Sequence, residues 1–100
     1  MAEPTLTVVA RITAKQDKVG QVKQKLTELI APTRAEPGCI RYVLHQSADD
    51  ECAFLFLEEW TSRAALDEHL AKPHLQAFVA ASKELLAKPL DITLWHQTAE

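Results

Sequence analysis

A carboxylate, a tryptophan and two histidines lie close together in the sequence, at Glu58, Trp60, His69 and His74. Histidine, with an unperturbed pKa of about 6.5, is the side chain best suited to accept a proton near neutral pH. Glu58 and Trp60 alternate with apolar residues as on a strand, so both side chains point to one face. A carboxylate on an apolar face needs a hydrogen-bond donor. We therefore predict that Glu58 pairs with His69 and makes this imidazole more basic.

Structural roles compete with this interpretation of the strand residues. Cross-strand pairing places position 58 opposite either Arg41 or Tyr42, and pairing with Arg41 would make Glu58 part of an ordinary ion pair. A tryptophan at position 60 is more often packed in the core than used to hold a ligand ring. The strand residues are therefore open to both a site and a core interpretation.

Each histidine also has two interpretations. His69 has apolar helical neighbours, so we expect it to be at least half buried, either as a proton acceptor or as a core or dimer histidine. His74 follows Pro73 in the first turn of a helix, where a solvated side chain is the commoner outcome. His45 shares a strand face with Arg41 and is expected to contact either a ligand or a dimer partner.

Metal and nucleotide sites are not expected. His69 and His74 are five residues apart with a proline between them, which departs from the i, i+4 spacing of helical metal pairs, and there is no CxxC motif. The two glycines form no phosphate-binding loop. Cys39 and Cys52 fall at opposite ends of a predicted hairpin, more than about 20 Å apart at about 3.3 Å per residue, so we expect free thiols.

The composition is that of a small globular protein, which we expect to form one domain over residues 1–100. Hydrophobic residues make up 47% of the chain and charged residues 25%, which favours a folded core. The net charge is -3, and the scattered Lys and Arg residues form no basic stripe for nucleic acid. There is no leader pattern and no apolar run near the roughly 20 residues that span a bilayer. We expect a cytoplasmic protein without a nucleic-acid or membrane partner.

Strand and helix patterns alternate along the chain. Helical spacing begins at Asp17 and ends at residues 36–38, and a second helix begins after Ser62 and restarts at Pro73. The order β-α-β-β-α-β predicts an α+β, ferredoxin-like fold, with helices on one face of a four-stranded antiparallel sheet. The strand patterns cover residues 6–14, 39–47, 53–60 and 92–97.

The third strand is apolar on both faces, whereas helices cover only one face of such a sheet. Burying roughly 500 Å² on the other face would contribute about 12 kcal/mol before the costs of association. An exposed apolar patch of that size is unusual on a monomer. We therefore predict a homodimer that pairs sheet against sheet.

Four stretches of the chain form a recognisable combination: "EPGCIRYVLHQSADD" from residue 36, "FLFLEEW" from residue 54, His69 with "PHLQAF" from residue 73, and "PLDITLW" from residue 89. Together they resemble the antibiotic biosynthesis monooxygenase family, in its small quinol monooxygenase branch. The resemblance covers about residues 6–96. It implies a dimeric α+β barrel that oxidises phenolic or quinol substrates with dioxygen, without metal, flavin or haem.

The resemblance also assigns motifs to positions. The family's E-x-W motif falls on Glu58 and Trp60, and its H-x4-H motif falls on His69 and His74. Family members that degrade haem carry an asparagine and an iron-ligating histidine at places that fall near Ala10 and Val79 here. Haem degradation is therefore disfavoured for this chain.

We expect one mainly apolar pocket per subunit, between sheet and helices, for a flat phenol-like or quinol-like molecule. In this hypothesis His69, oriented by Glu58, accepts a hydroxyl proton, the anionic ring reduces dioxygen, and His74 or His45 stabilises the polar end of the intermediate. The alternatives are a non-catalytic dimeric protein that binds a small molecule or responds to stress, and an oxygen-independent isomerase or signal-processing enzyme of the same fold. The expected lining residues are Phe54, Phe56, Trp60, Leu66 and Phe78.

Overall fold

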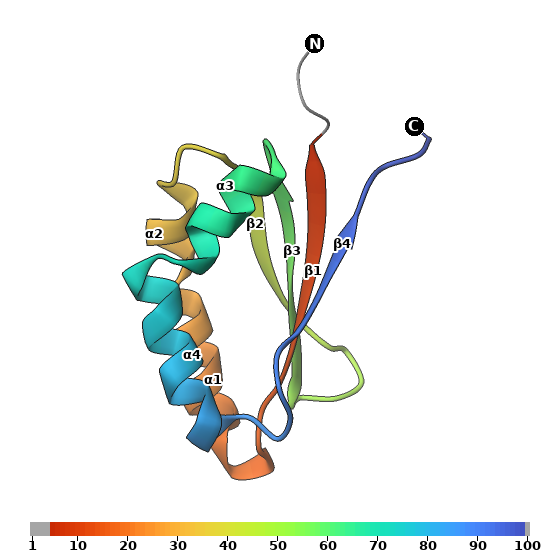
Figure 1. Ribbon diagram of the computed structural model, residues 1–100. Helices are drawn as coiled ribbons and strands as arrows, with labels where there is room; N and C mark the ends of the chain where they lie inside the picture. Colours follow the sequence, from red (N-terminus) through yellow and green to blue (C-terminus); the bar gives the residue numbers. More distant parts are fainter. Residues whose placement is uncertain (1–4, 100) are drawn as a thin grey trace.

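The computed structural model describes residues 5–99, which form a four-stranded antiparallel sheet with helices on one face (Figure 1). The strands lie in the order β2-β3-β1-β4. This arrangement confirms the ferredoxin-like α+β prediction. The strands are β1 (Leu6–Thr13), β2 (Cys39–Gln46), β3 (Ala53–Trp60) and β4 (Asp91–Trp95).

The first helical region is divided by a proline. A short 3-10 turn, η1 (Gln16–Lys18), leads into α1 (Val19–Glu28), and α2 (Ile30–Arg34) follows. Pro32 has no N–H to donate to the carbonyl of Glu28, and its ring crowds that carbonyl. The prediction of one continuous helix from Asp17 was therefore wrong, although the region is helical as expected.

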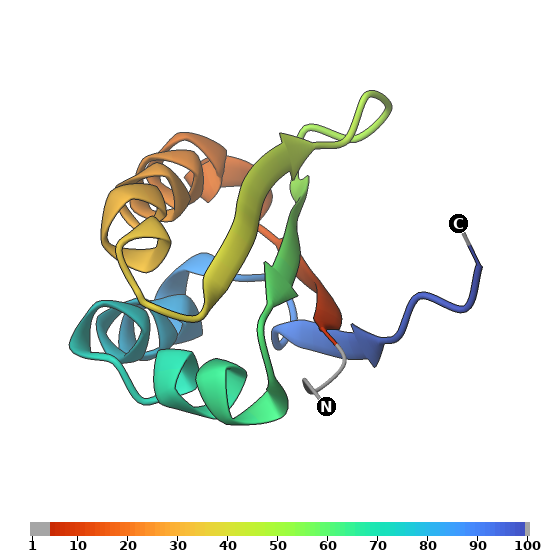
Figure 2. The ribbon, with the colours of Figure 1, turned by 90° about the horizontal axis from the view of Figure 1, so that it is seen from above.

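The second helical region has the predicted cap and restart. The helices α3 (Arg63–Leu70) and α4 (Pro73–Leu85) follow β3 and pack on the same face of the sheet as α1 and α2 (Figure 2). The Ser62 hydroxyl oxygen accepts the N–H of Ala65 at 3.1 Å, which satisfies a donor that the first turn of α3 leaves free. The long helix α4 runs beside α1 in the helical layer.

The register of β3 settles the environment of position 58. Glu58 lies opposite Tyr42 of β2 and Val8 of β1, whereas Arg41 lies opposite Glu59. Glu58 therefore faces the helices and does not form the alternative cross-strand pair with Arg41. The side chains of β3 that face the helices are all buried: Phe54, Phe56, Glu58 and Trp60.

The cysteines and the last strand largely follow the expectations from sequence. Cys39 and Cys52 are free thiols, as predicted. The last strand begins at Asp91 and ends at Trp95, two residues before the predicted end. Within residues 5–99, the helices lack the length and apolar character that a membrane crossing needs.

Candidate functional site

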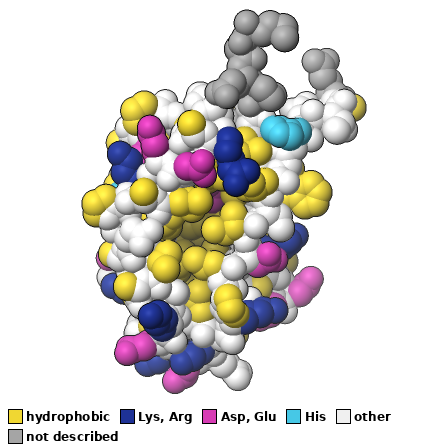
Figure 3. Space-filling view, in the orientation of Figure 1, with side chains coloured by type: hydrophobic (Ala, Val, Ile, Leu, Met, Phe, Trp, Pro, Cys, Tyr) yellow, Lys and Arg dark blue, Asp and Glu magenta, His cyan; other side chains and the backbone are white. Residues whose placement is uncertain are grey.

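A cavity of about 200 Å³ lies between the sheet and the helical layer. Its walls are mostly aliphatic and aromatic side chains of β1, β3, α1, α3 and α4. It opens to the surface between α4 and β4, where the space-filling view shows a hollow surrounded by hydrophobic side chains (Figure 3). The lining residues with polar side-chain groups are Tyr42, Glu58, His69 and Gln76.

The cavity contains part of the predicted apolar lining. Phe56, Leu66 and Phe78 line it as expected, whereas Phe54 and Trp60 are buried elsewhere in the core. The inclusion of these two residues was wrong because residues 54 to 60 span about 20 Å of strand at about 3.3 Å per residue. The cavity occupies only the middle of that length.

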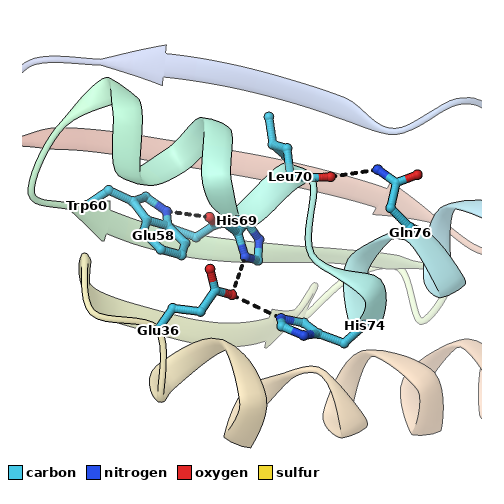
Figure 4. A network of polar contacts seen from close by, with 7 residues as sticks. All are labelled: Glu36, Glu58, Trp60, His69, Leu70, His74 and Gln76. Atoms are coloured by element: carbon cyan, nitrogen blue, oxygen red, sulfur yellow. Dashed lines mark hydrogen bonds and ion pairs between the residues drawn. The ribbon is translucent and has the colours of Figure 1, made fainter.

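Glu36, which sequence analysis missed, is the partner of both histidines. Its Oε2 atom lies 2.8 Å from Nδ1 of His69 and 3.0 Å from Nε2 of His74 (Figure 4). Glu58 Oε1 instead accepts the indole N–H of Trp60 at 2.9 Å. The predicted pair of Glu58 with His69 was wrong, because an indole two residues along the same strand face supplies the donor that Glu58 needs.

The break between α3 and α4 brings the two imidazoles together. In one continuous helix, residues five positions apart are rotated by about 140° from each other, so His69 and His74 would point in different directions. The N–H of Lys72 donates to the carbonyl of His69 at 3.1 Å, which ends α3 before Pro73 starts α4. The two imidazole centroids are consequently 6.1 Å apart.

A tight turn holds Glu36 beneath α3. The N–H of Cys39 donates to the carbonyl of Glu36 at 3.1 Å, and the N–H of Thr61 donates to the carbonyl of Gly38 at 2.9 Å. A Cβ atom on Gly38 would overlap the Cβ of Ala65 in α3. The absence of a side chain at position 38 thus lets the Glu36 turn approach the helix that carries His69.

His69 is a neutral, oriented imidazole with one free nitrogen. Burial lowers the pKa of His69, although the bond to Glu36 opposes this effect. We therefore assign the proton to Nδ1, which donates to Glu36, and a lone pair to Nε2. Nε2 has no hydrogen-bond partner. Among residues 5–99, the only side-chain polar atom that is both fully buried and without a partner is Thr33 Oγ1. Nε2 is therefore not fully buried, and we place it at the cavity that His69 lines.

Aromatic rings fix the position of this imidazole. The Trp60 ring lies 4.6 Å from the His69 ring, and the Tyr42 ring meets it edge-on at 5.6 Å. Tyr42 itself stacks on Phe56 with 4.1 Å between ring centroids. Burial raises the pKa of Tyr42, and the nearby Glu58 adds to this effect, so Tyr42 keeps its proton at neutral pH.

Glu58 places a second titratable group at the cavity. Burial raises the pKa of Glu58 to about 7, the Trp60 hydrogen bond opposes the shift, and the charge of Glu36 adds to it. Both protonation states are therefore populated near neutral pH. Oε1 is bonded to Trp60, and Oε2 is left to face the cavity that Glu58 lines.

The remaining two site histidines lie outside the cavity. His45 is exposed on the outer face of the sheet, where its Nδ1 atom lies 3.2 Å from the carbonyl oxygen of Val43. His45 does not reach this cavity, since β2 turns this side chain away from the helices and toward a hollow on the outer face; its contact with a ligand or a dimer partner stays a prediction. The His74 side chain is 23% exposed and borders a separate surface hollow, so it acts on the cavity only through Glu36.

The ligand atoms of Glu36, His69 and His74 lie within 4.8 Å of one another. The spacing of His69 and His74, which departs from that of helical metal pairs, thus does not keep the two imidazoles apart. Atoms that are all within about 2.2 Å of one metal ion are at most about 4.4 Å apart, so a metal would require this group to contract. The oxygen that bridges the two nitrogens at hydrogen-bond distances marks the group as a hydrogen-bonded cluster.

Comparison with known proteins identifies the family. The antibiotic biosynthesis monooxygenase family model matches residues 5–81. The Mycobacterium tuberculosis protein "Putative monooxygenase Rv0793" is 41% identical over 87 residues, which cover 87% of this chain and 85% of that protein. An uncharacterized Synechocystis protein, sll1783, is 38% identical over 94 residues; the match covers 94% of this chain but 64% of the longer relative.

Solved structures show the same fold over nearly the whole chain. The crystal structure of PA3566 from Pseudomonas aeruginosa has a TM-score of 0.93 and 33% identity, and the match covers 99% of both chains. The structure of Rv0793 has a TM-score of 0.90 and 36% identity over 96% of this chain and 97% of that one. With most of its length matched by the family model, this chain belongs to the antibiotic biosynthesis monooxygenase family.

Proposed function

We propose that this protein is a cofactor-independent monooxygenase that oxidises a small phenolic or quinol substrate with dioxygen. The observation that carries the proposal is the inner end of the cavity, where His69 and Glu58 interrupt an apolar lining. Family membership and the monooxygenase names of two relatives agree with this chemistry. The substrate class is the one that the family resemblance implies, and such electron-rich rings can themselves donate an electron to dioxygen.

The reaction balances without an external reductant. A quinol that takes one oxygen atom from O2 becomes a hydroxyquinone, and the second oxygen atom leaves as water with the two hydroxyl hydrogens. The substrate supplies all four electrons. The protein's contribution is then to ionise the ring and to exclude water from the intermediates.

His69 is the proposed proton acceptor. Its Nε2 lone pair faces the cavity, and the bond from Nδ1–H to Glu36 stabilises the imidazolium that forms when a substrate hydroxyl is deprotonated. General-base catalysis of this kind contributes about 10²- to 10⁴-fold in rate. His74 holds the other side of the Glu36 oxygen and is a positioning residue.

Glu58 is proposed to hold the second polar atom of the substrate. In its protonated form Glu58 can donate a hydrogen bond to a ring oxygen, whereas its ionised form would repel the anionic ring. With the pKa of Glu58 at about 7, the donor form is lost as the pH rises above neutrality. Substrate oxidation should therefore weaken on the alkaline side.

Two copies of the chain are proposed to pair through the outer face of the sheet. Leu55 and Leu57 of β3 and Val43 of β2 are only half buried there, and Trp95 of β4 is 53% exposed. Apolar cover on this face would come from a second sheet. Sedimentation should show a dimer at micromolar concentration and a monomer for Leu57→Glu; a monomeric wild type would contradict the pairing.

The decisive experiment mixes menadiol with the protein anaerobically and then admits ¹⁸O2. Wild type should consume oxygen faster than buffer and form a hydroxyquinone with one labelled oxygen atom, and His69→Gln should lose about 100-fold in rate. His96→Gln, which changes an exposed imidazole just after β4, is the matched control and should keep the rate. Equal rates for wild type, His69→Gln and buffer would overturn the proposal for this substrate.

Two other outcomes would redirect the interpretation. Tight ligand binding measured by calorimetry without oxygen consumption would favour a binding protein. Conversion of a ligand in the absence of oxygen would favour an isomerase.

A further inference from the structure

We infer that the ligand of this cavity carries a flexible apolar chain, which leaves the protein between α4 and β4. This inference rests on the proposed function for the identity of the ring, but it depends on a different part of the cavity. The ring occupies the inner end, beside Glu58 and His69, and the chain lies across the mouth. The substrate class is thus an alkylated or prenylated phenol or quinol rather than a bare ring.

Polar groups are confined to one part of the cavity. Tyr42, Glu58 and His69 are buried, with at most 4% of each residue exposed, and they meet at the inner end. At the mouth, Gln76 is the polar lining residue, and its Nε2 atom donates to the carbonyl of Leu70 at 2.6 Å. The backbone thus holds one N–H of the Gln76 amide, and the mouth offers this one polar side chain against three at the inner end.

The size of the cavity limits what can be enclosed. A volume of about 200 Å³ is below the roughly 300–1,000 Å³ that is usual for ligand pockets. A ring with a short substituent can fill such a space, but a long chain exceeds it. A long substituent opposite the polar end therefore has to leave through the mouth.

The surface around the mouth suits such a substituent. Val79 of α4 and Ile92 of β4 line the opening and are 38% and 40% exposed. Leu94, which follows Ile92 on the same face of β4, is 37% exposed. Single exposed apolar residues are ordinary, but two at the opening with Leu94 next to them form a patch that a chain could cover.

Val79 is exposed although it directly follows the buried Phe78 on α4. The sheet does not reach far enough to cover it, since β4 is an edge strand of only five residues. Val79 therefore borders the opening of the cavity.

Binding of 4-alkylphenols tests the inference without requiring turnover. The dissociation constants of 4-ethyl-, 4-butyl-, 4-hexyl- and 4-octylphenol would be measured by calorimetry on wild type, Val79→Lys and Ala80→Lys. For wild type, affinity should rise about 2- to 4-fold per methylene, because complete burial of one methylene corresponds to about 4-fold. The gain should shrink in Val79→Lys and persist in Ala80→Lys, whose changed side chain is the exposed neighbour of Val79 on α4.

The outcomes separate this inference from the proposed function. Affinity that does not change with chain length, or equal behaviour of the two lysine variants, would overturn the inference. The former result would also be expected if a second copy of the chain covered the mouth. Chain-length dependence without oxygen consumption would retain the inference and contradict the monooxygenase proposal, whereas oxidation of menadiol with no chain-length dependence would do the reverse.

Discussion

Glu36 and Glu58 are both buried carboxylates, with 8% and 4% of each residue exposed, yet their surroundings differ. Glu36 lies between α2 and β2, and a single oxygen atom meets two imidazole nitrogens. Glu58 lies on β3, has one indole donor, and borders the cavity. One carboxylate therefore binds two imidazoles outside the cavity lining, and the other presents an oxygen to the cavity.

The number of hydrogen-bond donors around each carboxylate distinguishes a supporting residue from one that can react with a ligand. Two imidazole groups tie Glu36 into the structure, so its main effect is to orient His69. Glu58 receives one hydrogen bond, and burial raises the pKa of Glu58 to about 7. Three substitutions test this contrast.

The largest effect is expected for Glu36→Ala. It removes the common acceptor of His69 and His74, and an unsatisfied buried polar group costs about 1–3 kcal/mol. With two such groups, we expect the free energy of unfolding in urea to fall by about 4 kcal/mol. Glu68→Ala on the exposed face of α3 is the matched control and should stay within about 0.5 kcal/mol of wild type. A similar small loss for both variants would show that Glu36 does not support the histidines.

A smaller, pH-dependent effect is expected from Glu58. The pKa of Glu58 is raised from 4.5 to about 7, so folded protein holds a proton that the unfolded chain has already lost. The free energy of unfolding should therefore fall by about 3 kcal/mol from this group as the pH rises from about 4.5 to above 7, at about 1.36 kcal/mol per pKa unit.

Glu58→Gln isolates this contribution. The amide oxygen can still accept the Trp60 N–H, but the side chain cannot ionise. As the pH rises, the free energy of unfolding of the variant should increase relative to that of wild type. Urea unfolding between pH 5 and 8 would measure this difference. The lowered pKa of His69 acts in the opposite sense, destabilising folded protein at acidic pH, but it is common to both proteins. A difference that is constant with pH would contradict the raised pKa of Glu58.

The smallest effect is expected for Gly38→Ala, which displaces the Glu36 turn and leaves the Glu58 strand in place. The new methyl group would overlap Ala65, so we expect a loss of about 2 kcal/mol, as for other overpacked sites. Gly20→Ala is the control, because a Cβ atom there meets nothing within 4 Å and alanine favours helix α1 by up to about 1 kcal/mol. Thermal unfolding should move in opposite directions for the two variants; a stabilised Gly38→Ala would show that the turn has room.

The fold was predictable because its signals are local. The alternation of residues 53–60 matches β3 at both ends, and Ser62 and Pro73 mark the starts of α3 and α4. Each signal depends on neighbours within a few residues. The break after Glu28 also has a local cause, Pro32, but its position four residues later was easy to overlook.

The site was less predictable because its contacts are distant in sequence. Glu36 is separated from His69 by 33 residues and from His74 by 38. A glutamate before Pro-Gly indicates the end of a helix, and its approach to α3 depends on the tight contact at Gly38. The acid predicted for His69 was Glu58, which lies on the apolar face of the strand just before α3, whereas the fold supplies Glu36 from the turn before β2.

The cavity between the layers has a thermodynamic consequence. Only the folded chain brings its lining side chains together, so only the folded chain offers a guest their van der Waals contacts. A guest that binds only the folded chain raises the melting temperature in proportion to the logarithm of its concentration. Heat resistance would thus report occupancy, and a small molecule in the surroundings would set how long the protein survives.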